Sequence, residues 1–166
     1  MSEGNGAISR RAIDEGFNQG NLSVIDELAS EGFANHDPSD GGEFVGREGA
    51  KQQSLTFRTA FPDLHLTIDE MIETGDKVVM RWTATGTHLG ELTGLAPTGA
   101  RITTTGITID RFQDGKTVES WSNWDTLGLM RQLGAAPEPG SLTERVGIQL
   151  QHLAARRRRS KAGASY

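Results

Sequence analysis

Residues 77–88, KVVMRWTATGTH, decide the fold class of this chain. In an extended backbone every second side chain points to the same face, and one face here holds Val78, Met80, Trp82, Ala84, Gly86 and His88. The other face holds Val79 and five polar side chains. A repeat of two residues with one apolar face indicates a strand in a half-buried sheet.

The repeat of two continues on both sides of this stretch, with a phase slip near Met71. Gly75-Asp76 and Asp114-Gly115 are typical hairpin turns, and residues 89–100 form a connection rich in Gly and Pro. Three further strands are predicted, over residues 64–72, 102–112 and 117–124. Four strands in this order predict a mainly antiparallel sheet.

The helical repeat governs the chain before Pro62 and again after Trp124. Residues 33–44, with NHDP at 35–38, have the composition of a loop. Helices are predicted over residues 8–20, 23–29, 46–61 and 126–133. A run of helices followed by a run of strands predicts an α+β domain with helices packed on one face of the sheet. If the sheet curves, that face and the helices enclose a pocket.

Composition indicates one soluble domain. The chain has 166 residues, 35% of them hydrophobic, and no cysteine. The missing cysteine excludes disulfides, thiolate nucleophiles and cysteine metal sites. No apolar run is long enough to cross a membrane and the first residues lack a secretory signal, so we expect a cytoplasmic protein. The only tyrosine is Tyr166, which disfavours a steroid isomerase mechanism built on a buried tyrosine.

The charge is divided unevenly along the chain. The last 15 residues carry five basic side chains and no acid, which leaves 12 basic and 22 acidic residues, a net charge of −10, in residues 1–151. An acidic body argues against nucleic-acid binding by the main surface. We expect a linker over residues 135–141 and a basic helical appendage with a frayed end over residues 142–166. The pattern Ser141-x-x-Glu144 caps this helix.

The role of the appendage is open between several alternatives. Val146, Leu150 and Leu153 recur at helical spacing, which favours a helix that docks on the body or on a dimer mate. The run Arg156 to Arg159 could also bind nucleic acid, an anionic membrane or the acidic body itself.

Asp125 is a candidate general acid or base. It ends the run ESWSNWD at residues 119–125, and alternation puts it on the same face as Glu119, Trp121 and Asn123. A carboxylate beside indole rings is desolvated, which raises its pKa toward the range useful at neutral pH. The alternative is that Asp125 caps the helix that starts at Thr126.

The histidines and tryptophans could likewise have either a functional or a structural role. His36 and His88 could act as proton shuttles or partners of the carboxylate, or each could be structural. Trp82, Trp121 and Phe17 could shape an apolar pocket, whereas strand aromatics are more often core residues. No phosphate-binding or dinucleotide motif is present, and the four histidines lack the spacing of metal ligands, so no cofactor and no metal are expected.

Ordered motifs over residues 8–134 resemble the SnoaL-like polyketide cyclase (ester cyclase) family. The motifs are FANHDP at 33–38, AFPD at 60–63, GTHLG at 86–90, PTG at 97–99, RFQDGK at 111–116 and ESWSNWDTLGLMRQLG at 119–134. The last motif is the most specific. The resemblance implies the cone-shaped fold of the nuclear transport factor two superfamily and a domain over residues 1–134.

The resemblance also implies a reaction, a cofactor-free intramolecular aldol ring closure on a polyketide ester. In that scheme an Asp removes an acidic proton between two carbonyls and returns a proton to the new alkoxide. Asp125 matches this Asp by position, and His36 and His88 fall in motifs that face the pocket. Many cyclase members carry an Asp two residues before the position of Trp124, where this chain has Ser122.

Two alternatives remain at this point. A non-catalytic module of the same fold could bind a small molecule or mediate dimerisation. An epoxide-hydrolase-like enzyme needs an Asp-Arg-Asp set, for which Asp110, Arg111 and Asp125 supply the residue types, but neighbouring strand residues point to opposite faces. We expect a small hydrophobic or polyketide-like ligand, a homodimer or higher homo-oligomer, no membrane, and nucleic acid only through the basic tail.

Overall fold

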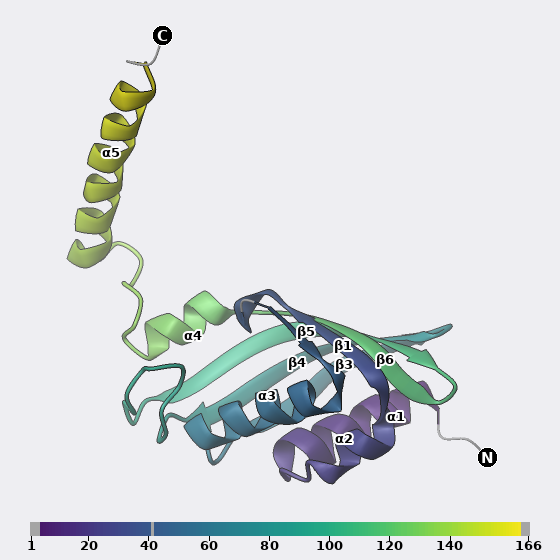
Figure 1. Cartoon of the computed structure of the whole chain (residues 1–166). Helices are drawn as coiled ribbons and strands as arrows, with labels where there is room; N and C mark the ends of the chain where they lie inside the picture. The colour runs from purple at the N-terminus through teal and green to yellow at the C-terminus, as the bar shows by residue number, and fades with distance from the viewer. Residues whose placement is uncertain (1–3, 41, 164–166) are drawn as a thin grey trace.

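The computed structural model describes residues 4–40 and 42–163 as one curved sheet with helices on one side (Figure 1). Helix α1 (Asn5–Arg11) continues into a π-helical segment, η1 (Ala12–Asn18). The helices that follow are α2 (Ser23–Leu28), the 3-10 turn η2 (Pro38–Asp40), α3 (Gly46–Ala60), α4 (Thr126–Gln132) and α5 (Leu142–Gly163). The strands are β1 (Ala29–Asp37), β2 (Gly42–Val45), β3 (His65–Thr74), β4 (Lys77–Thr87), β5 (Arg101–Gln113) and β6 (Lys116–Trp124).

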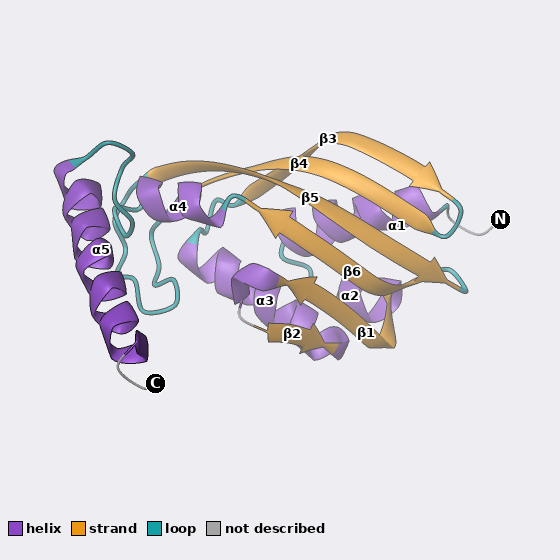
Figure 2. Ribbon diagram, turned by 90° about the horizontal axis from the view of Figure 1, so that it is seen from above, coloured by secondary structure: helices purple, strands orange, loops and turns teal. Residues whose placement is uncertain are grey.

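The strands form one sheet in the order β2-β1-β6-β5-β4-β3. Every neighbouring pair is antiparallel except β1 and β6, which are parallel. Seen from above, the sheet lies over α1, α2 and α3, which cover its concave face (Figure 2). The predicted α+β class, with a mainly antiparallel sheet and helices on one face, is confirmed.

The expectation of a loop over residues 33–44 is wrong, because β1 and β2 occupy most of this segment. Strand β1 pairs with β6 more than 80 positions later, with Asn35 opposite Ser120 and His36 opposite Trp121. A partner this far away in the sequence overrides the polar local composition. The first predicted helix also differs, because its second half widens to a π-helix from Ala12.

Strict alternation along β4 separates core from surface. Val78, Met80, Trp82 and Ala84 are buried, and Lys77 and Arg81 are exposed. The phase slip expected near Met71 lies between Ile68 and Glu70, where the pairing of β3 with β4 shifts. Trp82 lies opposite Gly106 of β5. A Cβ atom at Gly106 would collide with the Trp82 ring and lie 2.8 Å from Trp124 Cβ, so only glycine allows both indoles to pack here.

Helix α5 leads away from the body at the end of the linker (Figure 1). Ser141 caps it, because Ser141 Oγ accepts the Glu144 N–H at 3.2 Å, and the Glu144 carboxylate accepts the Gly140 N–H at 2.5 Å. The expected frayed end includes residues 164–166, which lie outside the described residues. No helix in the described part of the chain is long and apolar enough to span a bilayer.

Replacing Gly106 by alanine should destabilise the domain by about 1–3 kcal/mol, because the added methyl group overpacks the two tryptophans. Chemical denaturation followed by Trp fluorescence measures the loss. Gly32→Ala in β1 is the matched control, since no atom lies within 4 Å of a Cβ there. Equal effects of the two substitutions would contradict the packing argument.

Candidate functional site

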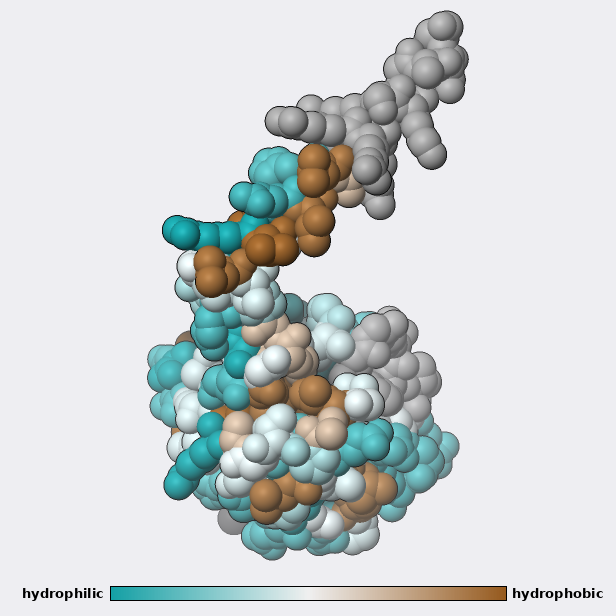
Figure 3. Space-filling view, turned by 90° about the vertical axis from the view of Figure 1, so that its left-hand side faces the viewer, coloured by the Kyte–Doolittle hydropathy of each residue, from teal (hydrophilic) through white to brown (hydrophobic). Residues whose placement is uncertain are grey.

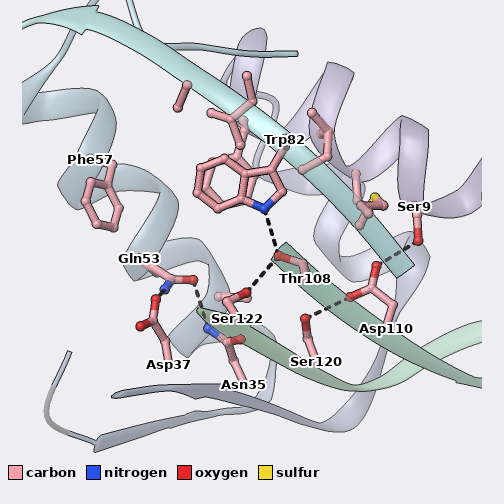
Figure 4. A pocket seen from close by; sticks show the side chains of 18 of the residues that line it. Ser9, Asn35, Asp37, Gln53, Phe57, Trp82, Thr108, Asp110, Ser120 and Ser122 are labelled. Atoms are coloured by element: carbon pink, nitrogen blue, oxygen red, sulfur yellow. Dashed lines mark hydrogen bonds between the residues drawn. The ribbon is translucent and has the colours of Figure 1, made fainter. Parts of the chain in front are cut away.

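A cavity of about 200 Å³ lies between the helices and the concave face of the sheet. Most of its wall is apolar and comes from η1, α2, α3 and the inward side chains of β4. The polar side chains of the wall come mainly from β1, β5 and β6 (Figure 4). They are Ser9, Asn35, Asp37, Gln53, Thr104, Thr108, Asp110, Thr117, Ser120 and Ser122. An apolar enclosure with a few convergent polar groups is the usual form of a small-molecule site.

Asp110 forms the first polar group, the Asp110 cluster, with Ser9 and Ser120. Ser9 Oγ donates to one carboxylate oxygen at 2.7 Å, and Ser120 Oγ donates to the other at 2.8 Å. Alternation along β5 turns Asp110 inward, and it is 7% exposed. The cluster joins α1 to two central strands of the sheet.

Burial raises the pKa of Asp110 above its ordinary value, because the apolar wall disfavours the ionised form. The hydrogen bonds from Ser9 and Ser120 act in the opposite direction but are the smaller effect. No cation contributes to the shift. A carboxyl group with a raised pKa inside a cavity is suited both to accept and to return a proton.

A chain of hydrogen bonds forms the second polar group. The Trp82 indole N–H donates to Thr108 Oγ1 at 3.0 Å, and Thr108 Oγ1 lies 2.9 Å from Ser122 Oγ. Since an indole can only donate, the Thr108 oxygen accepts from Trp82, and the Thr108 hydroxyl proton is free to point to Ser122. Ser122 can then donate its own proton into the cavity.

The third polar group, the Asp37 cluster, contains Asn35, Asp37, Gln53 and Trp124. Asp37 Oδ2 accepts the Trp124 indole N–H at 3.0 Å and a Gln53 N–H at 3.4 Å, and Asn35 donates to Gln53 at 3.0 Å. Asp37 Oδ1 accepts the backbone N–H and the hydroxyl of Ser39. Four donors therefore surround Asp37, which fixes Trp124 and Gln53 in the wall.

The structure places Asp125 outside the cavity wall, in contrast to the expectation of an inward carboxylate beside indole rings. Asp125 is exposed and is the N-cap of α4, where Oδ1 accepts the Gly128 N–H at 2.8 Å. A Cβ atom at Gly128 would collide with this carboxylate, so the sequence at 125–128 is fitted to the cap. Of the two interpretations of Asp125, the geometry matches capping.

His36 and Trp121 also lie outside the cavity, on the opposite face of the sheet, which corrects the expectation that both face the pocket. Their rings stack at a centroid distance of 5.4 Å, and His36 Nε2 lies 2.9 Å from Glu119 Oε1. Arg111 binds the other Glu119 oxygen at 2.7 Å, and this guanidinium, followed by His36, lowers the pKa of Glu119. The inward residues of β1 and β6 are the neighbours of these side chains in the sequence.

His88 is fully buried but does not line the cavity. Its Nδ1 accepts the Thr98 backbone N–H at 3.2 Å, and its ring lies 5.2 Å from that of Phe61. Its backbone also holds residues 99 and 100 through two hydrogen bonds of 2.9 Å. His88 therefore anchors the connection between β4 and β5.

Phe17 and Trp82 line the cavity, and their role in binding a substrate stays a prediction. The sequence analysis missed Trp124, and it considered Asp110 only as part of an epoxide-hydrolase-like set. Alternation along β5 from Ile102 was the signal that could have placed Asp110 inward. The Asp110, Arg111 and Asp125 set of an epoxide-hydrolase-like site is not assembled, because the three side chains lie in the cavity, on the outer face and at the α4 cap.

The model of the SnoaL-like polyketide cyclase family matches residues 7–133. The chain belongs to the SnoaL-like polyketide cyclase family. No functionally curated protein sequence matches it.

Solved structures agree with this membership. The SnoaL-like chain is 31% identical to IdmH of Streptomyces antibioticus, assigned as a polyketide cyclase, with a TM-score of 0.69 over 78% of this chain and 97% of that one. It is 30% identical to AclR of Streptomyces galilaeus, assigned as a hydroxylase, with a TM-score of 0.70 over 80% and 96%. The same fold is found in a protein of Catenulispora acidiphila described as ketosteroid isomerase-like in fold. It is 18% identical, with a TM-score of 0.66 over 78% of this chain and 93% of that one.

Ser122, at the position where the family resemblance implies an Asp in many members, lines the cavity. The buried carboxylate of Asp110 lies on the neighbouring strand, where Asp110 pairs with Ser120 and Thr108 pairs with Ser122. Among the described residues, no three His, Asp or Glu side chains are placed to hold a metal ion.

Substituting Asp125 in this SnoaL-like protein should affect stability and leave the cavity unchanged. Asp125→Ala should lower the free energy of unfolding by about 1 kcal/mol, because the α4 N-cap is lost, and Asp125→Asn should retain most of it. Urea denaturation measures both variants, and quenching of Trp fluorescence by an apolar ligand monitors the cavity. If Asn destabilises as much as Ala, the capping role is wrong.

Proposed function

We propose that this chain catalyses a cofactor-free, cyclase-type ring closure on a small polyketide-like ester, with Asp110 as general acid and base. The observation that carries the proposal is the buried Asp110 carboxyl group in the cavity wall, whose pKa burial raises. Family membership supports a cyclase-type role. The volume of about 200 Å³ lies below the roughly 300–1,000 Å³ of pockets for drug-sized ligands, which favours a small substrate.

The proposed reaction is an intramolecular aldol addition. The ionised Asp110 removes a proton from the carbon between two carbonyl groups, and the electron pair of the C–H bond becomes the enolate. The enolate carbon attacks a second carbonyl carbon of the same molecule, forming the C–C bond and an alkoxide. The alkoxide takes the proton from the neutral Asp110, which restores the carboxylate, so no co-reactant is required.

Asp110 is favoured over Asp37 by the hydrogen bonds that each carboxylate already accepts. A carboxylate offers about four lone-pair sites. Asp37 accepts four hydrogen bonds and has no site left for a substrate proton. Asp110 accepts two, both from hydroxyl groups, which leaves about two sites for the substrate.

Ser122 is the proposed donor to the substrate oxygen. When Thr108 donates to Ser122, one of the two directions open to this hydrogen bond, the Ser122 hydroxyl proton is left for the substrate oxygen. A donor held by neighbouring groups can stabilise charge that develops on an enolate or alkoxide oxygen. The Trp82 and Thr108 side chains act as positioning residues, because their hydrogen bonds hold the Ser122 oxygen in place.

Asp110→Asn should lower kcat by about 10²–10⁴-fold on an activated β-keto ester, because the amide cannot accept the proton. Ser122→Ala should lower kcat by about 10²–10³-fold through loss of the oxygen donor. Steady-state kinetics with ligand titration by Trp fluorescence measure turnover and binding separately.

The control for these variants is Asp125→Asn, which changes a carboxylate outside the cavity and should keep wild-type turnover. Full activity of Asp110→Asn would contradict the mechanism. Binding of the ester without turnover by the wild-type protein would support the alternative of a non-catalytic binding module.

The raised pKa of Asp110 also predicts how stability changes with pH. The folded-state pKa of Asp110 is above the unfolded-state pKa of about 3.9. The contribution of Asp110 to the free energy of unfolding is therefore complete below about pH 3.9, and it is lost as pH rises through the folded-state pKa. Asp110→Asn cannot ionise, so its Tm relative to wild type should increase between pH 4 and pH 8. A Tm difference that stays constant or decreases over this range would contradict the shift.

A further inference from the structure

Helix α5 carries an exposed apolar stripe. Leu142 is 78% exposed, and the other three members, Val146, Leu150 and Leu153, are each more than half exposed. The spacing of four, four and three residues places them on one side of the helix. Figure 3 shows apolar side chains gathered along the helix that projects from the body. Ile148 is also exposed but lies two residues from Val146 and from Leu150, on another side.

An exposed stripe of this kind requires a partner. Helices in proteins obtain most of their stability from the packing of an apolar face. Helix α5 projects away from its own body (Figure 1), and the linker before it is held by the Arg131 guanidinium on the Pro137 carbonyl at 3.1 Å and by Glu144 on the Gly140 N–H. A helix of 22 residues is about 33 Å long, which extends the stripe toward another molecule.

We propose that two copies of this chain pair through their α5 helices in antiparallel orientation, with a two-fold axis near Ile148. The stripe is nearly symmetric about this point. Leu142 of each copy then lies beside Leu153 of the other copy, and Val146 lies beside Leu150. A two-fold contact of this type uses the same surface on both copies.

The charge distribution selects the antiparallel orientation. The last 15 residues carry five basic side chains, whereas residues 1–151 have a net charge of −10. A parallel pair would bring the two runs of four arginines at 156–159 together, and like charges repel. An antiparallel pair brings each basic end to the start of the other helix, beside Glu138, Glu144 and the acidic body.

The first test compares two substitutions on α5 of the full chain. Leu150→Glu places a charge in the centre of the proposed contact and should weaken dimerisation by about 100-fold or more. Ile148→Glu introduces the same charge outside the stripe and is the matched control. Sedimentation equilibrium should give wild type and Ile148→Glu twice the mass of Leu150→Glu, and far-UV circular dichroism with Tm should confirm that the body of each variant is folded.

The second test determines the orientation of the two helices. Because the chain has no native cysteine, an introduced cysteine is its only thiol. Under mild oxidation, a mixture of Leu142→Cys and Leu153→Cys proteins should form a disulfide between the two kinds of chain, and each variant alone should form few. Disulfides between two copies of the same variant would indicate a parallel pair and overturn the proposed orientation.

Other occupants of the stripe give different results. Equal masses for wild type and Leu150→Glu would overturn the dimer contact. A monomeric wild-type protein that binds vesicles of anionic phospholipid through α5, and loses this binding in Leu150→Glu, would identify a membrane surface as the partner instead. These results do not depend on turnover, so the dimer contact and the proposed chemistry of Asp110 can fail separately.

Discussion

The structure depends on one constraint, which is that only one face of the sheet is covered by helices. Side chains of a strand alternate between the two faces, so each strand must place its apolar set toward α1, α2 and α3. The same rule turns Asp110, Ser120 and Ser122 into the cavity. Their neighbours Arg111, Glu119 and Trp121 point to the outer face, where Arg111 and His36 bind Glu119. The register of the strands therefore determines which polar side chains face the cavity.

Asp110 and Glu119 show how strongly the face of the sheet determines the chemistry of a carboxyl group. On the cavity side, burial raises the pKa of Asp110, because two neutral hydroxyl donors compensate the loss of water only in part. On the outer face, the Arg111 guanidinium lowers the pKa of Glu119. Residues 110 and 111 are adjacent in the sequence but lie on opposite faces. Asp110 is the desolvated carboxyl group of the cavity, and Arg111 is the cation that favours the ionised form of Glu119.

The order of helices and strands could be predicted from the sequence because local periodicity determines it. β1 could not, because its pairing with β6 depends on residues more than 80 positions away. For β6, alternation defines two sets of residues but not which set is covered, and each set contains a tryptophan. Trp121 was therefore expected in the pocket, whereas Trp124 is the one that donates to Asp37. Asp125 satisfied the rules for a cap and for a catalyst equally, and only the tertiary structure separated the two.

The proposed chemistry has a geometric requirement that the strand register meets. Proton abstraction needs a base within reach of the reacting carbon and a donor within reach of the carbonyl oxygen. Asp110 pairs with Ser120, and Ser122 is two residues further along the same strand. Diagonal neighbours of this kind are about 7–8 Å apart across an antiparallel pair. This spacing leaves room for a substrate carbonyl between the proposed base and the proposed donor, and a carboxylate at position 122 with a hydroxyl at 110 would have the same spacing.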